Sequence, residues 1–275
     1  MTLCLGKKPA VKDERDLLFA DFKKPTAEGA YPVAPVGFGE KHAALLTPHL
    51  LMMGNGPAMP GDDIPPTWIA AQQGAGDCVW ADAGNRVRYS NLLAGKQVTV
   101  TGEECIEMYQ AETGYDPITG ANDNGTDMRD ALNYARTTGI LDHNGSRHLI
   151  GGYCALGTTG DALWTELLEA LAVFDVVSIG LQFRQCYMDQ FNAGQPWNYQ
   201  ADSPIVGGHD VLVATRRLAN QIQVFTWATL HDVYADVVVK DVDEAYGIFL
   251  PDSMVAGKGP EGFDMAEYQA ALAAL

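Results

Sequence analysis

The order of two hydrophobic periodicities is the feature that most constrains the fold of this chain. Apolar residues recur at helical spacing up to about residue 175, whereas short strand patterns prevail between about 176 and 250. Because helices and strands are segregated along the chain, the sequence predicts an α+β fold in which a helical half packs on an antiparallel sheet or barrel. No linker divides residues 41–275, so we expect one domain there, preceded by an extended arm over residues 1–40.

Local signals position the individual elements. Thr101 and Glu104 form a capping box at the start of one helix, and Thr126 or Asp127 caps the next. The connection 216–220 is short, so the strands on either side of it should pair as a hairpin. The expected helices cover 79–93, a segment after Thr101, 128–138, 160–173 and 264–275, and the expected strands cover 176–181, 205–215, 221–227, 233–239 and a segment ending at 249–251.

Charge and cysteine content exclude several kinds of partner. The chain has 18 Lys and Arg against 35 Asp and Glu, a formal net charge of −17, whereas phosphate contacts require a basic patch. We therefore expect no nucleic-acid partner. No apolar run is long enough to span a membrane, and the N-terminal residues lack the order of a signal peptide, which predicts synthesis in the cytoplasm. The five cysteines contain no CxxC pair, so we expect mostly reduced thiols, no metal site and no cofactor.

Two segments near the start of the chain carry little regular pattern. Prolines interrupt residues 1–40, and such an arm could wrap the domain or bind an assembly partner. We favour wrapping, because four aromatic side chains of the arm need burial: Phe19, Phe22, Tyr31 and Phe38. The loop 54–67 is rich in Gly, Pro and Asp and is expected to form an insertion or a mobile rim.

The stretch from Gln72 to Cys78 is the candidate for chemistry. A thiol at the start of a helix gains thiolate character from the helix dipole, and an amide such as that of Gln72 can donate to a developing oxyanion. The intervening Gly74 and Gly76 permit close approach of a substrate backbone. A lone cysteine at such a junction is more often a core residue, so the functional interpretation depends on the rest of the chain.

Downstream of Cys78, further segments occur in an order that resembles papain-like cysteine peptidases. Gln72 and Cys78 are separated by five intervening residues, as in that family, and Gly-Gly-His at 207–209 resembles its histidine strand. The other segments that carry the resemblance are Asn124-Gly125-x-x-Met128, the run from Asn133 to Ile140, the run from Leu167 to Gly180, and Phe225-Thr226-Trp227-Ala228. The resemblance covers roughly residues 68–250. It is greatest to uncharacterised papain-like proteins of bacteria and tailed phages.

The resemblance implies a role for each site residue. His209 would deprotonate Cys78, the nucleophile, and later protonate the leaving amine. Gln72 and the backbone N–H of Cys78 would hold the oxyanion, with Gln73 as a substitute for Gln72. Trp227 would shield the Cys–His pair.

This chain departs from the family pattern where the third catalytic residue is expected. Phe225 stands at the position of the family's Asn and cannot orient an imidazole, whereas the neighbouring Thr226 can hydrogen-bond. Other polar residues near in sequence are Asp210, Asn220, His231 and Asp232. Thr226 is our candidate third member, with these four left open.

The sequence thus supports a papain-like thiol hydrolase, a peptidase or amidase acting on a peptide or amide substrate. The alternative is a catalytically degenerate papain-like module that serves as a structural component of a phage particle or another assembly, with residues 1–40 contacting the partner. A metal site that uses Cys78 and His209 as two ligands is a third reading, but no further ligand pair is spaced for it.

Overall fold

The computed structural model describes residues 5–25, 27–46, 62–250 and 263–274. Its core is a six-stranded sheet whose neighbouring strands are all antiparallel. In sheet order the strands are β3 (Gly152–Ala155), β8 (Val242–Phe249), β4 (Val177–Arg184), β5 (Ile205–Leu218), β6 (Gln221–Thr226) and β7 (Thr229–Tyr234). The predicted α+β class is confirmed, and so is the hairpin of β5 and β6.

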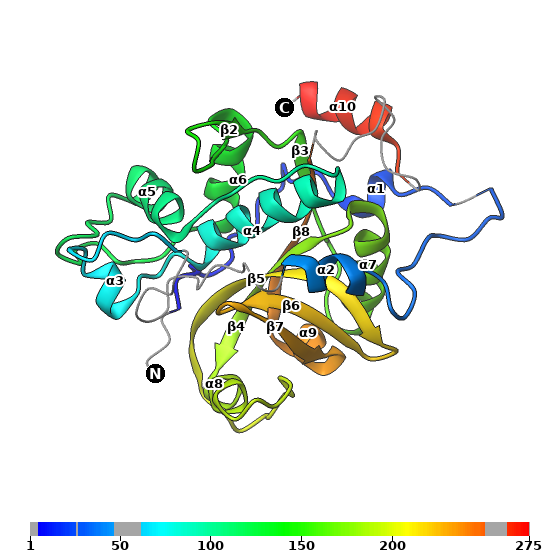
Figure 1. Cartoon of the computed structure of the whole chain (residues 1–275). Coiled ribbons are helices and arrows are strands. Elements are labelled where there is room, and N and C mark those ends of the chain that lie inside the picture. Colours follow the sequence, from blue (N-terminus) through cyan, green and yellow to red (C-terminus); the bar gives the residue numbers. More distant parts are fainter. Residues whose placement is uncertain (1–4, 26, 47–61, 251–262, 275) are drawn as a thin grey trace.

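The longest helix, α4 (Cys78–Leu93), crosses above the sheet and packs on β5 (Figure 1). Helices α5 (Gly102–Thr113) and α6 (Met128–Thr137) lie beyond it, together with the small pair β1 (Ile140–Leu141) and β2 (Arg147–His148). Helix α5 starts with the expected Thr101–Glu104 capping box, and the Asp127 side chain caps α6. These local signals placed both helix starts correctly because the capping atoms are within a few residues of the amides they satisfy.

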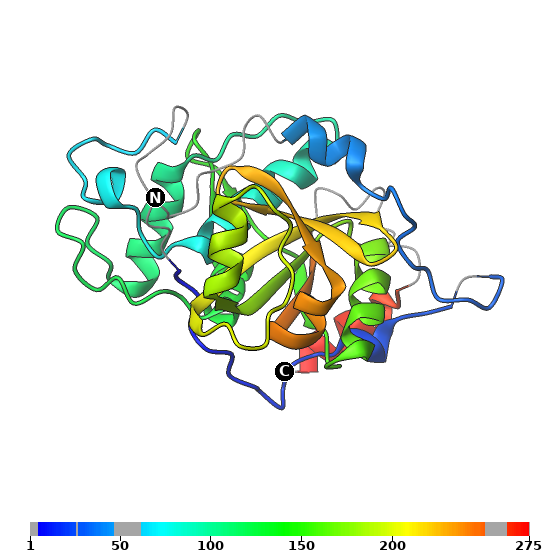
Figure 2. The same ribbon diagram turned by 90° about the horizontal axis from the view of Figure 1, so that it is seen from below.

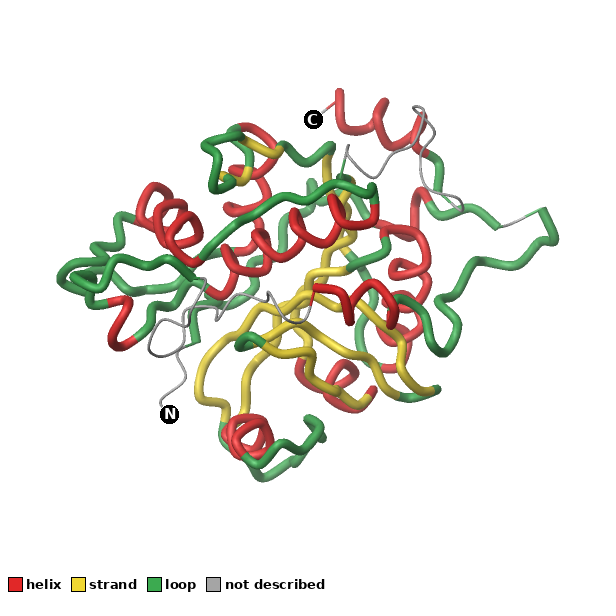
Figure 3. The backbone as a smooth tube through the Cα atoms, viewed as in Figure 1, coloured by secondary structure: helices red, strands yellow, loops and turns green. Residues whose placement is uncertain are grey.

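The remaining helices surround the sheet. Figure 2 shows α7 and α8 on opposite sides of the central strands, and Figure 3 shows the strands gathered together with helices on several sides of them. These helices are α1 (Phe19–Phe22), α2 (Glu40–Leu46), α3 (Ala70–Gln73), α7 (Asp161–Phe174), α8 (Gln185–Asn192), α9 (Ala235–Asp241) and α10 (Met265–Ala274). In the part of the chain that the structure describes, no helix is long and apolar enough to cross a membrane.

The expected strand at 233–239 is wrong. Strand β7 ends at Tyr234, and α9 begins at Ala235. A short valine run fits a strand or a buried helix equally well by periodicity. The tertiary structure chooses the helix, because α9 buries Val237 and Val238 where it packs on α7.

The division of the chain into a helical half and a strand half is not complete in the structure. Strand β3 comes from the helical half and joins the sheet beside β8, whereas α8 and α9 lie within the strand-rich half.

Parts of the arm pack on the body of the protein, whereas the stretch after α1 extends away from it (Figure 1). Phe19 and Phe22 are buried and pack on Phe263, while Phe38 pairs with Arg216 of β5. Tyr31 is exposed, although Lys23 lies over its ring. Most of the expected rim, 54–61, falls outside the described residues.

Candidate active site

Cys78 is the first residue of α4, and its side chain is buried. The backbone amides of Asp210 and Gly6 donate to the sulfur. Burial, and next the charge of Asp210, raise the thiol pKa to about 12. The expected thiolate at the helix start is therefore wrong for this state, because the cost of burying an anion outweighs the helix dipole and the two donated hydrogen bonds.

His209 lies on β5, directly before the residue whose amide contacts the sulfur of Cys78. Its ring is fully buried, which lowers the imidazole pKa to about 3, so the ring is neutral. Nε2 lies 2.8 Å from Oγ1 of Thr226. Among the described residues, Nδ1 has no hydrogen-bond partner. One ring nitrogen is thus anchored by Thr226, and the other is buried without a partner in the described part of the chain.

Aromatic rings enclose the imidazole. Trp227 stacks on His209 with ring centroids 4.5 Å apart and an angle of 15° between the planes. Phe183 and Trp197 contact the same imidazole ring edge-on, at 5.3 Å and 6.3 Å. This enclosure explains the lowered pKa, because no water reaches the ring to solvate its charged form.

Strand β6 and the turn after it bring Thr226 and Trp227 to the histidine, whereas Phe225 points to the other face of the sheet. Adjacent side chains alternate between the faces of a strand. Phe225 packs on Tyr89 of α4, with centroids 5.8 Å apart, whereas Thr226 meets His209. Position 225 carries no side-chain amide in this chain. The side-chain partner of the imidazole is therefore the hydroxyl of Thr226, one residue later.

The other polar residues considered as third members have different partners. His231 packs against Phe191 and Trp197, and burial lowers its pKa to about 4. Asp232 bonds to Arg217 and Gln223. Asn220 lies in the turn between β5 and β6, and Asp210 reaches Cys78 through its backbone.

Gln72 lies on the short helix α3 and is exposed, as is Gln73. A buried stretch from Ala75 to Asp77 connects this helix to Cys78. No hydrogen bond joins the Gln72 side chain to Cys78 or His209 within the described ranges. The structure thus brings Thr226 and Trp227 to the His209 ring and the amide of Asp210 to the Cys78 sulfur. No hydrogen bond joins that sulfur to the His209 ring in the described part of the chain, and Gln72 is exposed.

The N-terminal segment Leu5–Lys8 runs through this region, which sequence reasoning missed. The amide of Thr126 donates to the Gly6 carbonyl at 2.7 Å, and the amide of Lys8 donates back to the Thr126 carbonyl at 3.0 Å. On the other side, the Lys7 amide donates to the carbonyl of Gly208 at 3.1 Å. The segment is therefore held between the loop before α6 and the histidine strand.

Glycines make room for this segment. A Cβ on Gly6 would lie 1.8 Å from the carbonyl oxygen of Gly76, and one on Gly125 would lie 2.2 Å from that of Gly6. Asp123 links the two glycine segments on either side of Gly6. Its carboxylate accepts from the Gly76 amide at 2.9 Å and from the Tyr109 hydroxyl at 2.8 Å. The Tyr109 hydroxyl in turn accepts from the Gly125 amide. The glycines at 76, 125, 207 and 208 were the sequence signal for a backbone-lined groove.

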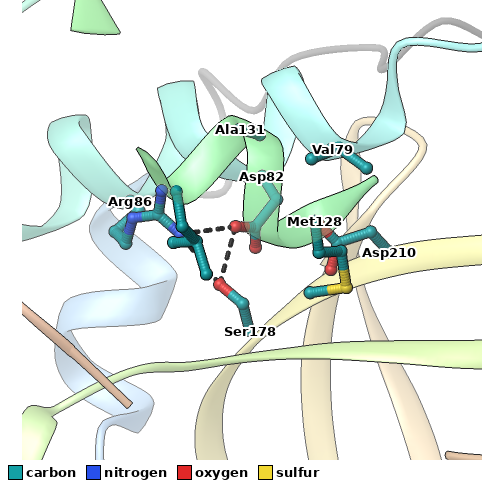
Figure 4. A pocket seen from close by; sticks show the side chains of 8 residues that line it. Val79, Asp82, Arg86, Met128, Ala131, Ser178 and Asp210 are labelled. Atoms are coloured by element: carbon teal, nitrogen blue, oxygen red, sulfur yellow. Dashed lines mark hydrogen bonds and ion pairs between the residues drawn. The ribbon is translucent and has the colours of Figure 1, made fainter. Parts of the chain in front are cut away.

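A buried ionic cluster lies between α4, α6 and the strands β4 and β5 (Figure 4). Arg86 pairs with Asp82 at 2.8 Å, and both bond to Ser178. Asp210 lines the same cavity of about 10 Å³, enough for about one water molecule. Burial and the charge of Asp82 raise the pKa of Asp210 well above its usual range.

Comparisons with known proteins agree on the fold. A scan of protein-family models gives no match, and neither does a search of curated proteins. Among solved structures, the chain is similar to xylellain, a cysteine protease from Xylella fastidiosa, with a TM-score of 0.56 and 14% identity over 90% of this chain and 97% of the other. It also matches procathepsin B of Trypanosoma congolense, with a TM-score of 0.48 and 11% identity over 88% of this chain and 92% of the other.

The likeness to xylellain shows that the chain has a papain-like fold. The predicted papain-like fold is therefore confirmed.

Proposed function

We propose that this protein is a thiol hydrolase that cleaves peptide or amide bonds with Cys78 as nucleophile and His209 as general base. One observation carries the proposal. The residue after His209 hydrogen-bonds to the Cys78 sulfur, while Thr226 anchors Nε2 of the same imidazole and leaves Nδ1 without a partner in the described chain. A nucleophile, a base and a group that orients the base are the parts that acyl transfer to a thiol requires.

The proposed reaction proceeds in two steps. His209 takes the thiol proton at Nδ1, and the sulfur attacks the carbonyl carbon to form a C–S bond and an oxyanion. The backbone N–H of Cys78 and the Gln72 amide stabilise this oxyanion, with Gln73 as the substitute donor. The imidazolium protonates the leaving amine as the C–N bond breaks. Water, deprotonated by His209, then hydrolyses the thioester and restores the thiol.

Thr226 and Trp227 act on the base rather than on substrate. Thr226 fixes the orientation of the ring through Nε2, and Trp227 covers its face. A neutral hydroxyl stabilises the protonated imidazole less than a carboxylate or an amide oxygen would. Formation of the thiolate–imidazolium pair therefore depends more on the position of the ring relative to the sulfur than on compensation of the imidazolium charge.

The described state is closed. The Gly6 amide sits against the sulfur, and burial keeps the thiol and the imidazole neutral. Substrate must therefore displace Gly6 before the Cys–His pair can react.

Active-site alkylation tests the proposal. The purified chain is incubated with a peptidyl epoxide, and modification of each cysteine is followed by mass spectrometry, alongside hydrolysis of fluorogenic peptides. We expect modification at Cys78 and its loss in His209→Gln. Cys105→Ala, which removes a buried thiol of α5, is the matched control and should change neither readout.

Slow and equal modification of Cys78, Cys105, Cys154 and Cys186, with no peptide hydrolysis, would refute the thiol hydrolase. The assembly alternative predicts a partner on residues 1–40, but parts of that arm already pack on its own domain.

A further inference from the structure

A pocket of about 350 Å³ lies between four parts of the chain that are far apart in sequence. Its walls come from residues 13–17 of the arm, from α6, from β3 and from α10, which packs on α1 (Figure 1). Within the described chain, none of its lining residues bonds to Cys78, to His209 or to residues 5–8. A pocket of this size is large enough to hold a small molecule.

Helix α6 turns a row of polar side chains to this pocket. Arg129, Asn133 and Arg136 stand at i, i+4 and i+7, the spacing that places side chains along one face of a helix. Oδ1 of Asn133 accepts a hydrogen bond from the Tyr153 hydroxyl at 3.1 Å, which leaves the two amide hydrogens of Asn133 as donors. The helix therefore presents hydrogen-bond donors to the pocket.

Two of the three arginines in the pocket are already paired with carboxylates. Asp16 accepts two hydrogen bonds from Arg129, at 3.0 Å and 2.5 Å. Asp13 accepts two from Arg15, at 3.0 Å and 2.6 Å. Arg136 forms no hydrogen bond or ion pair with any residue that the structure describes. The pocket therefore carries one positive charge that no carboxylate compensates.

The buried cation Lys7 shows the contrast. Its Nζ lies 3.0 Å from Oδ1 of Asp243 and 2.9 Å from Oε1 of Glu244, because a β-bulge in β8 lets these consecutive residues face one cation. The charge of Lys7 is thus fully used inside the protein. The charge of Arg136 is exposed at the pocket and attracts an anion.

The remaining wall of the pocket is apolar. Leu17 of the arm, Tyr153 of β3 and Leu272 of α10 are half-buried, so each keeps part of its surface accessible. The hydroxyl proton of Tyr153 is engaged by Asn133, and the ring offers its apolar face. A ligand can therefore pack an apolar body against these side chains while its charged end reaches Arg136.

The charge balance of the pocket selects the kind of anion. Asp13 and Asp16 lie in the same pocket and disfavour a second negative charge on the ligand. A phosphate ester carries close to two negative charges at neutral pH, whereas a carboxylate carries one. A carboxylate is also planar and accepts two parallel hydrogen bonds from a guanidinium group.

We propose that this pocket binds a small monocarboxylic acid with an apolar body. The carboxylate lies on Arg136 and Asn133, and the body lies on Leu17, Tyr153 and Leu272. Such an acid can be a free molecule or the C-terminal residue of a peptide, since both offer the same chemistry. The pocket shares no residue with the proposed catalytic pair, so the inference stands independently of the thiol hydrolase.

Ligand-observed NMR titration of the full chain tests the site. Three probes share one phenyl body: phenylpropionate, phenylpropionamide and phenethyl phosphate. We expect the acid to bind at least about 10-fold more tightly than the amide or the phosphate ester. Arg136→Gln should abolish this preference, and Arg136→Lys should keep part of it, because the charge remains without the planar fork. Lys240→Gln, which removes an equal charge at an exposed site of α9, should leave the preference unchanged.

A second variant places the apolar body on another element and covers the case in which substitution of Arg136 impairs folding. Leu272→Ala removes part of the apolar wall and should weaken the acid and the amide alike. A further probe, acetylglycyl-phenylalanine, distinguishes the two sources of the acid. Binding as tight as that of phenylpropionate identifies a peptide terminus, and weaker binding identifies a free acid.

Four results would overturn the proposal. They are no binding of the acid, equal binding of the acid and the amide, binding of the phosphate ester as tight as that of the acid, and a preference for the acid that persists in Arg136→Gln.

Discussion

The side chain of Thr226 determines how the imidazole of His209 is held. Its Oγ1 is 2.8 Å from Nε2 of His209, and β6 turns Phe225 to the opposite face. Because the neutral ring has one proton, donation from Nε2 to Thr226 leaves Nδ1 as the acceptor that a thiol needs. The hydroxyl of Thr226 can accept this bond, which is the arrangement that the proposed reaction requires.

Removal of this hydroxyl should impair turnover more than folding. Thr226→Val conserves volume and leaves Nε2 of His209 without its partner, so we expect kcat/KM to fall about 10- to 100-fold, with a stability loss of about 1 kcal/mol. Steady-state peptide hydrolysis and urea denaturation measure the two effects. Thr226→Ser, which restores the oxygen, should recover most of the activity. A Val variant as active as the wild type would exclude Thr226 as an orienting group.

Burial of His209 should also make its contribution to stability depend on pH. The folded pKa of about 3 lies below the ordinary 6.5, so in the window between these values the unfolded chain binds a proton that the folded chain does not. The contribution is therefore fully present above pH 6.5 and is lost as pH falls towards 3. Between pH 6.5 and 5 the loss is on the order of 2 kcal/mol.

The contribution of buried carboxyl groups to stability has the opposite pH dependence over part of this range, because burial raises the pKa of Asp77 to about 8. The comparison is therefore made against His209→Gln by urea denaturation at each pH. The stability difference between wild type and variant should shrink from pH 7 to pH 5. A constant difference would contradict a neutral buried ring.

At the scale of elements, the β6–β7 turn positions Trp227 over the histidine. Thr226 pairs with Thr229, so Trp227 and Ala228 are the two turn residues, and both have left-handed φ values of 42° and 56°. A two-residue hairpin prefers this conformation because it matches the twist of the strands, but side chains other than glycine pay for it in strain.

Relief of that strain should stabilise the protein. Ala228→Gly keeps the turn and removes the clashing Cβ, so we expect a gain of up to about 1 kcal/mol in the free energy of unfolding. Thermal and urea denaturation provide the measurement. The matched control is Ala155→Gly in strand β3, which should lose roughly 0.5–1 kcal/mol because extended backbone gains nothing from glycine. Equal losses in the two variants would show that the turn is unstrained.

At the scale of the whole molecule, the first described residues close the site that the two halves form. The segment Leu5–Lys8 bonds to Thr126 on the helical side and to Gly208 on the sheet side. Its place depends on Gly6, because any side chain there would meet the carbonyl of Gly76.

A side chain on Gly6 should therefore open the site. Gly6→Ala places a Cβ 1.8 Å from backbone oxygen, and the segment must leave the groove. The thiol then loses part of the burial that raises its pKa to about 12, so we expect iodoacetamide to modify Cys78 at least about 10-fold faster at neutral pH.

Cys105, buried on α5, is the internal control in the same sample. Its modification rate should stay unchanged, because the segment does not cover it. Parallel acceleration of Cys78 and Cys105 would indicate general unfolding, and an unchanged rate at Cys78 would show that the segment does not close the site.

Much of the fold followed from local sequence signals. The helix beginning at Cys78, the capping box at Thr101 and the hairpin across 216–220 all depend on atoms a few residues apart, so the sequence determined them. The strand predicted over the valine run at 237–239 was wrong because its structure depends on a distant contact. Its choice between strand and helix was made by packing on α7, which lies far away in the chain.

The same division applies to the site. The chemistry of Cys78 and His209, and the hydroxyl that follows Phe225, are properties of the sequence and could be named from it. That Thr226 meets His209, that Gly6 and Lys7 fill the groove, and that a bulge turns Asp243 and Glu244 to one cation were decided only by the tertiary structure. These contacts join residues up to 237 positions apart, as from Lys7 to Glu244. Only burial of the core determines which of the many possible pairs are formed.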